Sequence, residues 1–126
     1  DDSEILTKTS IANNKALVIG DPLYENDNLP QLPAAEEEGI RVANKLNANG
    51  YTTDSLIHGT TAAIMQELFT DKYKILHFAG HGIYDIEKGQ GKAGVAIGNG
   101  ICIDAAKIKQ LGYVPEFVFI NCCFSK

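Results

Sequence analysis

The chain has 126 residues and a mass of 13.6 kDa, which is the size of one ordinary domain and leaves no room for two. Its 44% hydrophobic and 21% charged residues indicate a packed core and argue against intrinsic disorder. A net charge of −5 disfavours binding to nucleic acid or anionic lipid through bulk charge. The longest apolar runs, such as residues 16–19, are too short to span a membrane. We therefore expect neither a nucleic-acid nor a membrane partner.

The cysteines argue against an extracellular disulfide framework. Cys102, Cys122 and Cys123 are an odd set, and two of them are adjacent, whereas secreted frameworks use even and dispersed cysteines. Reduced thiols in the cytoplasm are the simpler interpretation. The chain also begins at Asp1 without a methionine, so we interpret it as a piece of a longer protein.

Short apolar runs alternate with amphipathic helical patterns along most of the chain. Residues 1–14 are polar and aperiodic and are expected to form a linker. Beyond them the patterns predict strands at residues 15–20, 51–57, 73–79 and 117–122, and helices that begin near Pro33, at Thr60 or Thr61, and at Asp104. Asn99-Gly100 lies between two short apolar runs and predicts a small hairpin within residues 93–103.

This element order predicts an α/β three-layer fold with a mostly parallel sheet. In such sheets, ligands and chemistry lie beyond the carboxyl ends of the strands. Here those ends carry Asp21, the sequence Gly80-His81-Gly82, and the pair Cys122-Cys123. The sequence therefore predicts a functional site at this edge of the sheet.

His77 and His81 are four residues apart, which on a helix would suggest a zinc pair. Within a strand, the same spacing separates the Cα atoms by roughly 13 Å, too far to share one ion. We therefore expect no metal site and no cofactor. His77 is predicted to be a packed, hydrogen-bonded histidine. His81 is expected at the end of its strand, where flanking glycines let the backbone turn and approach a ligand closely.

Cys123 occupies the equivalent place one strand later. A thiol near a histidine and two backbone N–H groups is the minimum equipment for acyl transfer. The competing interpretation is that the cysteines are small buried hydrophobic residues. That interpretation is favoured for Cys122, which strand alternation places opposite Cys123, and for Cys102 in the hairpin. From spacing alone, a Cys–His catalytic pair and a redox or structural role stay equally open.

Five segments in order resemble the CHAT domain, a caspase-like branch of the clan that holds caspases, metacaspases, separase and gingipains. The resemblance covers nearly the whole chain from residue 15, and five motifs in register are specific although each is modest alone. The matching segments are residues 15–22 (first strand and a Gly-Asn-Pro-like turn), 32–38 (Leu-Pro-x-Ala-x-x-Glu), 75–82 (His-Phe-x-x-His-Gly), 94–108 (hairpin and helix) and 118–124 (a Leu-Ser-Ala-Cys-like segment). Two positions depart from the pattern: Asp21 replaces an asparagine, and Lys126 stands where a glycine commonly follows.

The resemblance implies a role for each site residue. Cys123 is the thiolate that attacks a peptide carbonyl and forms a thioester, and His81 protonates the leaving amine. The backbone N–H groups of Gly82 and Cys123 hold the oxyanion. Asp21 lies near the pocket for the residue before the scissile bond and would favour a basic side chain if it faces inward. Asp21 before a proline equally suits a simple turn.

The resemblance also implies that residues 15–126 are the N-terminal, large-subunit-like part of a caspase-like peptidase domain. About six main strands are expected, of which four are recognisable, so about two C-terminal strands should cover the apolar strand at residues 117–122. We expect a second polypeptide, the C-terminal remainder of a processed or split domain, to supply them. Residues 1–126 alone are not expected to be a stable monomer.

The favoured function is that of a cytoplasmic cysteine endopeptidase domain, fused to or associated with a helical-repeat (tetratricopeptide) sensor module and cutting a protein or peptide substrate. One alternative is a non-catalytic caspase-fold module that binds proteins through the same groove. A less favoured one is a thiol redox switch at Cys122 and Cys123, whose adjacency would strain a disulfide. The joint presence of His81, Gly82 and Cys123 favours the peptidase.

Overall fold

The computed structural model describes residues 13–85 and 92–124, so the predicted linker lies almost wholly outside the described residues. Within them the chain forms six strands and three helices, in the order β1 (Lys15–Gly20), α2 (Pro33–Ala48), β2 (Thr52–Ile57), α3 (Thr61–Thr70), β3 (Ile75–Asp85), β4 (Lys92–Gly98), β5 (Ile101–Asp104), α4 (Ala105–Lys109) and β6 (Phe117–Phe124). All of the predicted helices and strands are therefore present.

Local side-chain chemistry sets where two of the helices begin. The Thr60 hydroxyl accepts a hydrogen bond from the Ala63 N–H (3.1 Å), which caps α3. The Asp104 carboxylate accepts one from the Lys107 N–H (3.0 Å), which caps α4. Each cap satisfies a backbone donor that the first helical turn leaves unpaired. The sequence predicted Asp104 as one of these starts and left Thr60 and Thr61 as alternatives for the other.

The sheet is mixed, which corrects the expectation of a mostly parallel sheet. The four main strands are parallel and lie in the order β2-β1-β3-β6. The predicted hairpin, β4 and β5, pairs antiparallel with the carboxyl half of β3 and so extends the same sheet. Its turn at Asn99 and Gly100 has positive φ at both residues (54° and 72°), as a two-residue hairpin turn requires.

The hairpin can join the sheet because β3 is longer than predicted. The sequence indicates a strand that ends at Ala79, but β3 continues to Asp85. β1 stops at Gly20, opposite Ala79, and beyond that point Gly82 of β3 pairs with Val95 of β4. The backbone therefore does not turn at His81.

Gly80, which precedes His81, is needed for close packing rather than for a turn, since its φ is not positive. A Cβ atom at Gly80 would lie 2.8 Å from the Tyr24 hydroxyl and 3.3 Å from Pro22 Cδ. The loop after β1 can therefore approach β3 closely only because Gly80 has no side chain.

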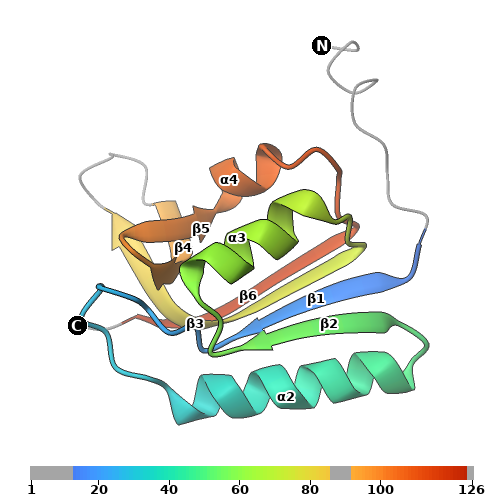
Figure 1. Cartoon of the computed structure of the whole chain (residues 1–126), viewed down its shortest axis with the longest axis horizontal. Helices are drawn as coiled ribbons and strands as arrows, with labels where there is room; N and C mark the ends of the chain where they lie inside the picture. The colour runs from blue at the N-terminus through green and yellow to red at the C-terminus, as the bar shows by residue number, and fades with distance from the viewer. Residues whose placement is uncertain (1–12, 86–91, 125–126) are drawn as a thin grey trace.

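Figure 1 shows α2 against one face of the sheet and α3 with α4 against the other. The main hydrophobic core lies between the sheet and the α3/α4 layer, and its buried members are Leu17, Ile19, Ile64, Leu68, Tyr73, Leu76, Phe78, Val95, Ile97, Ile103, Leu111 and Tyr113. In the described part of the chain, no helix has the length and apolar character needed to cross a membrane.

Strand β6 leaves a long apolar surface in contact with solvent. Among the described residues it pairs only with β3. Phe117, Val118, Phe119 and Ile120 follow one another along it and are 37–51% exposed. Because successive strand residues point to opposite faces, β6 is uncovered on both sides of the sheet.

Candidate catalytic site

Two adjacent parallel strands bring His81 and Cys123 together. β3 and β6 lie side by side (Figure 1), and in their register His81 is the direct Cα partner of Cys123. Neighbouring strands are about 4.8 Å apart, so the two backbones are as close as a sheet allows. Gly82 follows His81 and pairs with Phe124 on one side and with Val95 on the other. The residues predicted as a catalytic dyad therefore share the carboxyl edge of the sheet.

The His81 ring has one nitrogen bonded and one nitrogen available. The side chain is buried, with 4% of the residue exposed. Its Nε2 lies 2.7 Å from the backbone oxygen of Pro30, and because a carbonyl oxygen only accepts, Nε2 must carry a hydrogen. Nδ1 is buried and has no hydrogen-bond partner among the described residues. In the neutral ring, Nδ1 therefore holds the lone pair and can accept or return a proton.

Tyr24 fixes both the backbone and the ring of His81. The His81 N–H donates to the Tyr24 hydroxyl oxygen (3.2 Å), and that hydroxyl donates to Asp21 Oδ1 (2.8 Å). The two rings meet edge-on, with centroids 4.9 Å apart. Tyr24 is itself buried, at 2% exposure, so water does not compete for the hydrogen bonds through which it holds His81 in place.

Asp21 is fully buried and organises the loop between β1 and α2. Both carboxylate oxygens lie 3.0 Å from the Leu32 N–H, which begins α2. Oδ2 also accepts from Gln31 Nε2 (2.8 Å) and lies 3.3 Å from His58 Nε2. These bonds satisfy a buried charge that would otherwise be costly. They tie Asp21 to the loop, and the substrate contact predicted for it stays a prediction.

The hairpin turn holds the same loop from the other side. The Asn99 N–H donates to the Glu25 carbonyl (2.5 Å), and Asn26 Nδ2 donates to Asn99 Oδ1 (2.7 Å). The Gly100 N–H donates to Asp27 Oδ1 (2.7 Å). Apart from Asp21, sequence reasoning missed this loop as part of the site. The only feature of the sequence that indicates the loop is its run of Asn and Asp residues. Nothing in the sequence indicates the contact made by the Pro30 carbonyl.

His77 and Glu38 join two of the motifs found in the sequence. His77 Nε2 lies 2.8 Å from Glu38 Oε2, and both side chains are nearly buried, at 13% and 14% exposure. The other Glu38 oxygen accepts a hydrogen bond from Asn121 Nδ2 of β6. His77 is thus a packed, hydrogen-bonded histidine, as predicted. Glu38 of α2 contacts side chains from both strands that lead to the candidate dyad.

A pocket of about 220 Å³ lies between the start of α2, the middle of β3 and the carboxyl half of β6. Its lining residues are Leu32, Pro33, Ala34, Ala35, Glu38, Ala79, Gly80 and Asn121. Gly80 immediately precedes His81, and Asn121 is two residues before Cys123. The pocket therefore adjoins the candidate catalytic pair.

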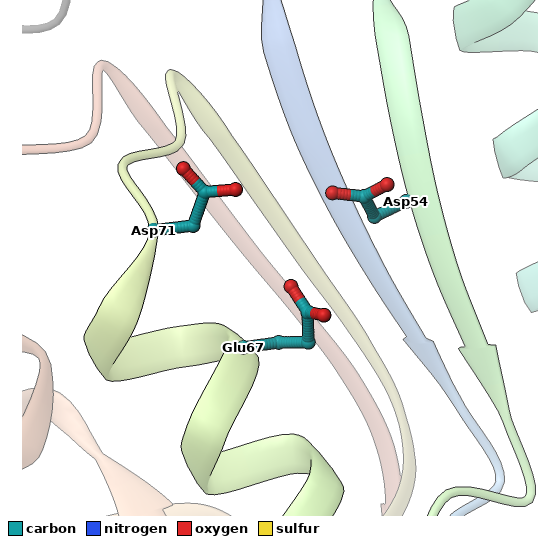
Figure 2. Close-up of side chains that lie close together, drawn as sticks. All are labelled: Asp54, Glu67 and Asp71. Atoms are coloured by element: carbon teal, nitrogen blue, oxygen red, sulfur yellow. The ribbon is translucent and has the colours of Figure 1, made fainter.

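A second group of acidic residues lies between β2 and α3. The side chains of Asp54 on β2, Glu67 on α3 and Asp71 point toward one another (Figure 2), with one oxygen of each within 4.8 Å of the others. The Tyr73 hydroxyl lies 2.8 Å from Asp54 and 2.7 Å from Glu67 and can give its proton to only one at a time. Burial and these two carboxylates raise the pKa of Tyr73 well above its usual range.

Asp71 in this group already has a positively charged partner. It forms an ion pair with Lys15, and that hydrogen bond, together with one from the Lys72 N–H, lowers the pKa of the Asp71 carboxyl. The Lys15 Nζ also lies 5.2 Å from the centre of the Tyr73 ring. The cluster therefore links α3, β1 and β2, and Asp71 is the member with an ion-pair partner among the described residues.

The fold defines an α/β domain in which a buried histidine and a cysteine occupy paired backbone positions on neighbouring strands. A family model described as the CHAT domain matches residues 3–126, and the chain belongs to this family, which is caspase-like and peptidase-related. A search of curated proteins and a search of solved structures each returned no match.

Proposed function

We propose that this CHAT domain is a cysteine endopeptidase domain that cleaves a protein partner through a dyad of Cys123 and His81. The observation that carries the proposal is the direct register of the two residues on β3 and β6, next to a pocket and at the edge where α/β sheets bind ligands. Membership of a peptidase-related family supports it.

In the proposed reaction, His81 Nδ1 first takes the proton of the Cys123 thiol, and the resulting thiolate attacks the carbonyl carbon of the scissile peptide bond. A carbon–sulfur bond forms, the carbon–nitrogen bond breaks, and the leaving amine takes a proton from His81. Water then attacks the thioester while His81 Nδ1 takes one of its protons. The carbon–sulfur bond breaks, the proton passes to the cysteine sulfur, and the new carboxylic acid and the thiol are released. Nδ1 is the nitrogen that carries this proton, because Nε2 keeps its hydrogen on the Pro30 carbonyl throughout.

The loop network supports this role by limiting the motion of His81. The ring is held by Pro30 on one nitrogen and by Tyr24 along one edge. A positioned acid or base is more effective than a mobile one, because the ordering cost is met before the substrate binds. We propose the N–H groups of Gly82 and Cys123 as oxyanion donors, each worth about 3 kcal/mol of transition-state stabilisation.

The uncovered surface of β6 suggests which further parts of the protein pack against this domain. A groove of about 460 Å³ lies between the C-terminal half of α2 and the exposed face of β6, and Phe117 and Phe119 form part of its wall. We propose that the C-terminal remainder of the peptidase domain covers β6 and this groove. The whole protein would act in the cytoplasm, where the thiols stay reduced, with a helical-repeat (tetratricopeptide) module as its sensor.

The test is a pair of neighbouring substitutions in the full-length protein. Cys123→Ala is expected to abolish peptide cleavage, and Cys122→Ala is expected to keep most of it, because only the former is the register partner of His81. Release of a fluorophore from a peptide library measures both. Equal losses from the two variants would show that the nucleophile has been placed one residue off.

A thiol-directed covalent peptide probe separates the peptidase from a non-catalytic module. Labelling at Cys123 that disappears in His81→Ala supports the dyad. Absence of labelling in the folded full-length protein would instead favour a caspase-fold module that only binds proteins.

A further inference from the structure

The pocket beside the candidate dyad has apolar walls and one acidic residue. Its walls come mainly from Leu32, Ala34, Ala35 and Ala79, which offer only alkyl groups. Glu38 adds a carboxylate that is 14% exposed. A side chain with a hydrocarbon stem and a polar tip would therefore match the pocket along its length.

Glu38 has hydrogen-bond partners but no permanent positive charge beside it. Its two oxygens contact His77 Nε2 and Asn121 Nδ2. Among the residues that the structure describes, no lysine or arginine forms an ion pair with it. Hydrogen bonds stabilise a carboxylate that is largely withdrawn from water, and a permanent counter-charge, which His77 provides only when protonated, stabilises it further. An occupant of the pocket could supply that charge.

Glu38 and Asn121 can also accept further hydrogen bonds from a group in the pocket. Each carboxylate oxygen can accept two hydrogen bonds, so Glu38 can accept more than the two it receives. The Asn121 side chain donates through Nδ2, and no partner of its Oδ1 is found among the described residues. A donor group entering the pocket would find acceptors on both side chains.

We propose that this pocket binds the side chain of a lysine or arginine immediately before the scissile bond, with Glu38 and Asn121 as the residues that select it. The inference rests on the proposed peptidase function and specifies its substrate class. The distance fits, because Asn121 lies two strand residues, or about 7 Å, before Cys123, which is comparable to an extended lysine side chain.

The same contacts disfavour the other classes of side chain. An apolar occupant would remove Glu38 and Asn121 from water without replacing their hydrogen bonds. An acidic occupant would meet the like charge of Glu38. The start of α2 also lines the pocket and carries a partial positive charge, but this amounts to about half a unit against the full negative charge of Glu38.

The proposal moves the selecting charge from Asp21, where the sequence suggested it, to Glu38. Asp21 is fully buried, and its oxygens already accept from Tyr24, Gln31 and Leu32. Glu38 instead lines an open pocket.

The experiment compares three covalent peptide probes on the full-length protein. They are acyloxymethyl ketones that differ only in the last residue, which is lysine, norleucine or aspartate. Norleucine has the same four-carbon side chain as lysine without the ammonium group. The second-order rate constant for labelling Cys123 is expected to be about tenfold or more higher for lysine than for norleucine, and lowest for aspartate.

Glu38→Gln keeps the shape of the side chain and removes its charge, so it should reduce the lysine-to-norleucine ratio to about threefold or less. Glu37→Gln is the matched control, because Glu37 is the next residue on α2, is exposed and does not line the pocket. Using a ratio cancels any loss of folded protein in either variant.

Each outcome decides the inference. Equal labelling by lysine and norleucine probes, or an unchanged ratio in Glu38→Gln, overturns the inference and leaves the proposed peptidase standing. No labelling by any of the three probes, in a protein shown to be folded, overturns the proposed function, and the inference falls with it.

Discussion

The two histidines of β3 lie four residues apart and have different surroundings. His77 contacts Glu38 on α2 and has a tilted contact with the Phe119 ring of β6. His81 contacts the loop after β1 through Pro30 and Tyr24 and has Cys123 as its register partner. Both are largely buried, so replacing either one should lower the stability of the fold. Only replacement of His81 should abolish peptide cleavage.

We expect His77→Ala and His81→Ala each to lower the free energy of unfolding by about 1–3 kcal/mol, since each removes a hydrogen-bonded ring from a packed site. His81→Ala should also abolish peptide cleavage, while His77→Ala keeps it within about tenfold of the parent. Chemical denaturation and a cleavage assay on the full-length protein measure the two effects. Loss of cleavage in a folded His77→Ala protein would contradict the assignment.

At the scale of elements, the site depends on a loop held between β3 and the hairpin. The loop supplies Tyr24 and the Pro30 carbonyl to His81. It has little regular structure of its own, and Tyr24, Asn26 and Asn28 have positive φ, which is uncommon outside glycine. Hydrogen bonds from the turn at Asn99 and Gly100 compensate for this conformation. The hairpin insert therefore supports the candidate site through the loop.

Substitutions of two glycines at the hairpin turn can test whether the loop packs against the hairpin. A Cβ at Gly98 would meet Thr61 Oγ1 and lie 2.8 Å from the Glu25 backbone nitrogen, whereas a Cβ at Gly100 meets nothing within 4 Å. Both have positive φ. Gly100→Ala should therefore cost about 1 kcal/mol of stability from backbone strain alone. Gly98→Ala should cost about 3 kcal/mol or more, because it adds a steric clash.

Chemical denaturation measures this difference, and cleavage by the folded protein should also fall in Gly98→Ala, because the displaced loop holds His81. Similar stability losses in the two variants would mean that the loop does not pack against the hairpin as described.

At the scale of the whole molecule, β6 is both the site's second strand and its least protected one. It positions Cys123 beside His81 while exposing Phe117 to Ile120 on an unpaired edge. Such an edge tends to pair with another strand.

We expect residues 1–126, produced alone, to self-associate, and a preparation that includes the C-terminal remainder to be monodisperse. Phe119→Lys in the isolated fragment should reduce association, because a charge on an exposed edge opposes strand addition. Size-exclusion chromatography with light scattering measures this. A monomeric, folded and active fragment would contradict the need for further strands.

Buried tyrosines make stability depend on alkaline pH. Burial is the main cause that raises the pKa values of Tyr73 and Tyr113, so the folded state keeps both hydroxyls neutral. Their contribution to stability is complete below the unfolded pKa of about 10 and is lost as the pH rises above it, by about 1.4 kcal/mol per pH unit for each tyrosine. Tyr113→Phe should reduce this slope by about 1.4 kcal/mol per pH unit. Urea unfolding at pH 9 to 12 measures it, and a flat profile would contradict the prediction.

Local sequence patterns determined most of the elements of this protein. Continuous apolar runs marked the strands, Thr60 and Asp104 marked helix starts, and Asn99-Gly100 marked the hairpin turn. These features could be predicted because each depends on residues a few positions apart. The same patterns placed Cys123 near the end of its strand, but they wrongly ended the preceding strand before His81, which β3 passes by four residues.

Tertiary structure alone decided how these pieces meet. The register of His81 with Cys123, the extension of β3 by the hairpin, and the mixed sheet all arise from pairing between distant segments. The Pro30 carbonyl reaches a ring 51 residues away, and Glu38 reaches His77 across 39 residues. No local periodicity encodes such contacts, because they depend on which surfaces remain to be buried and which polar groups remain to be paired once the sheet has formed.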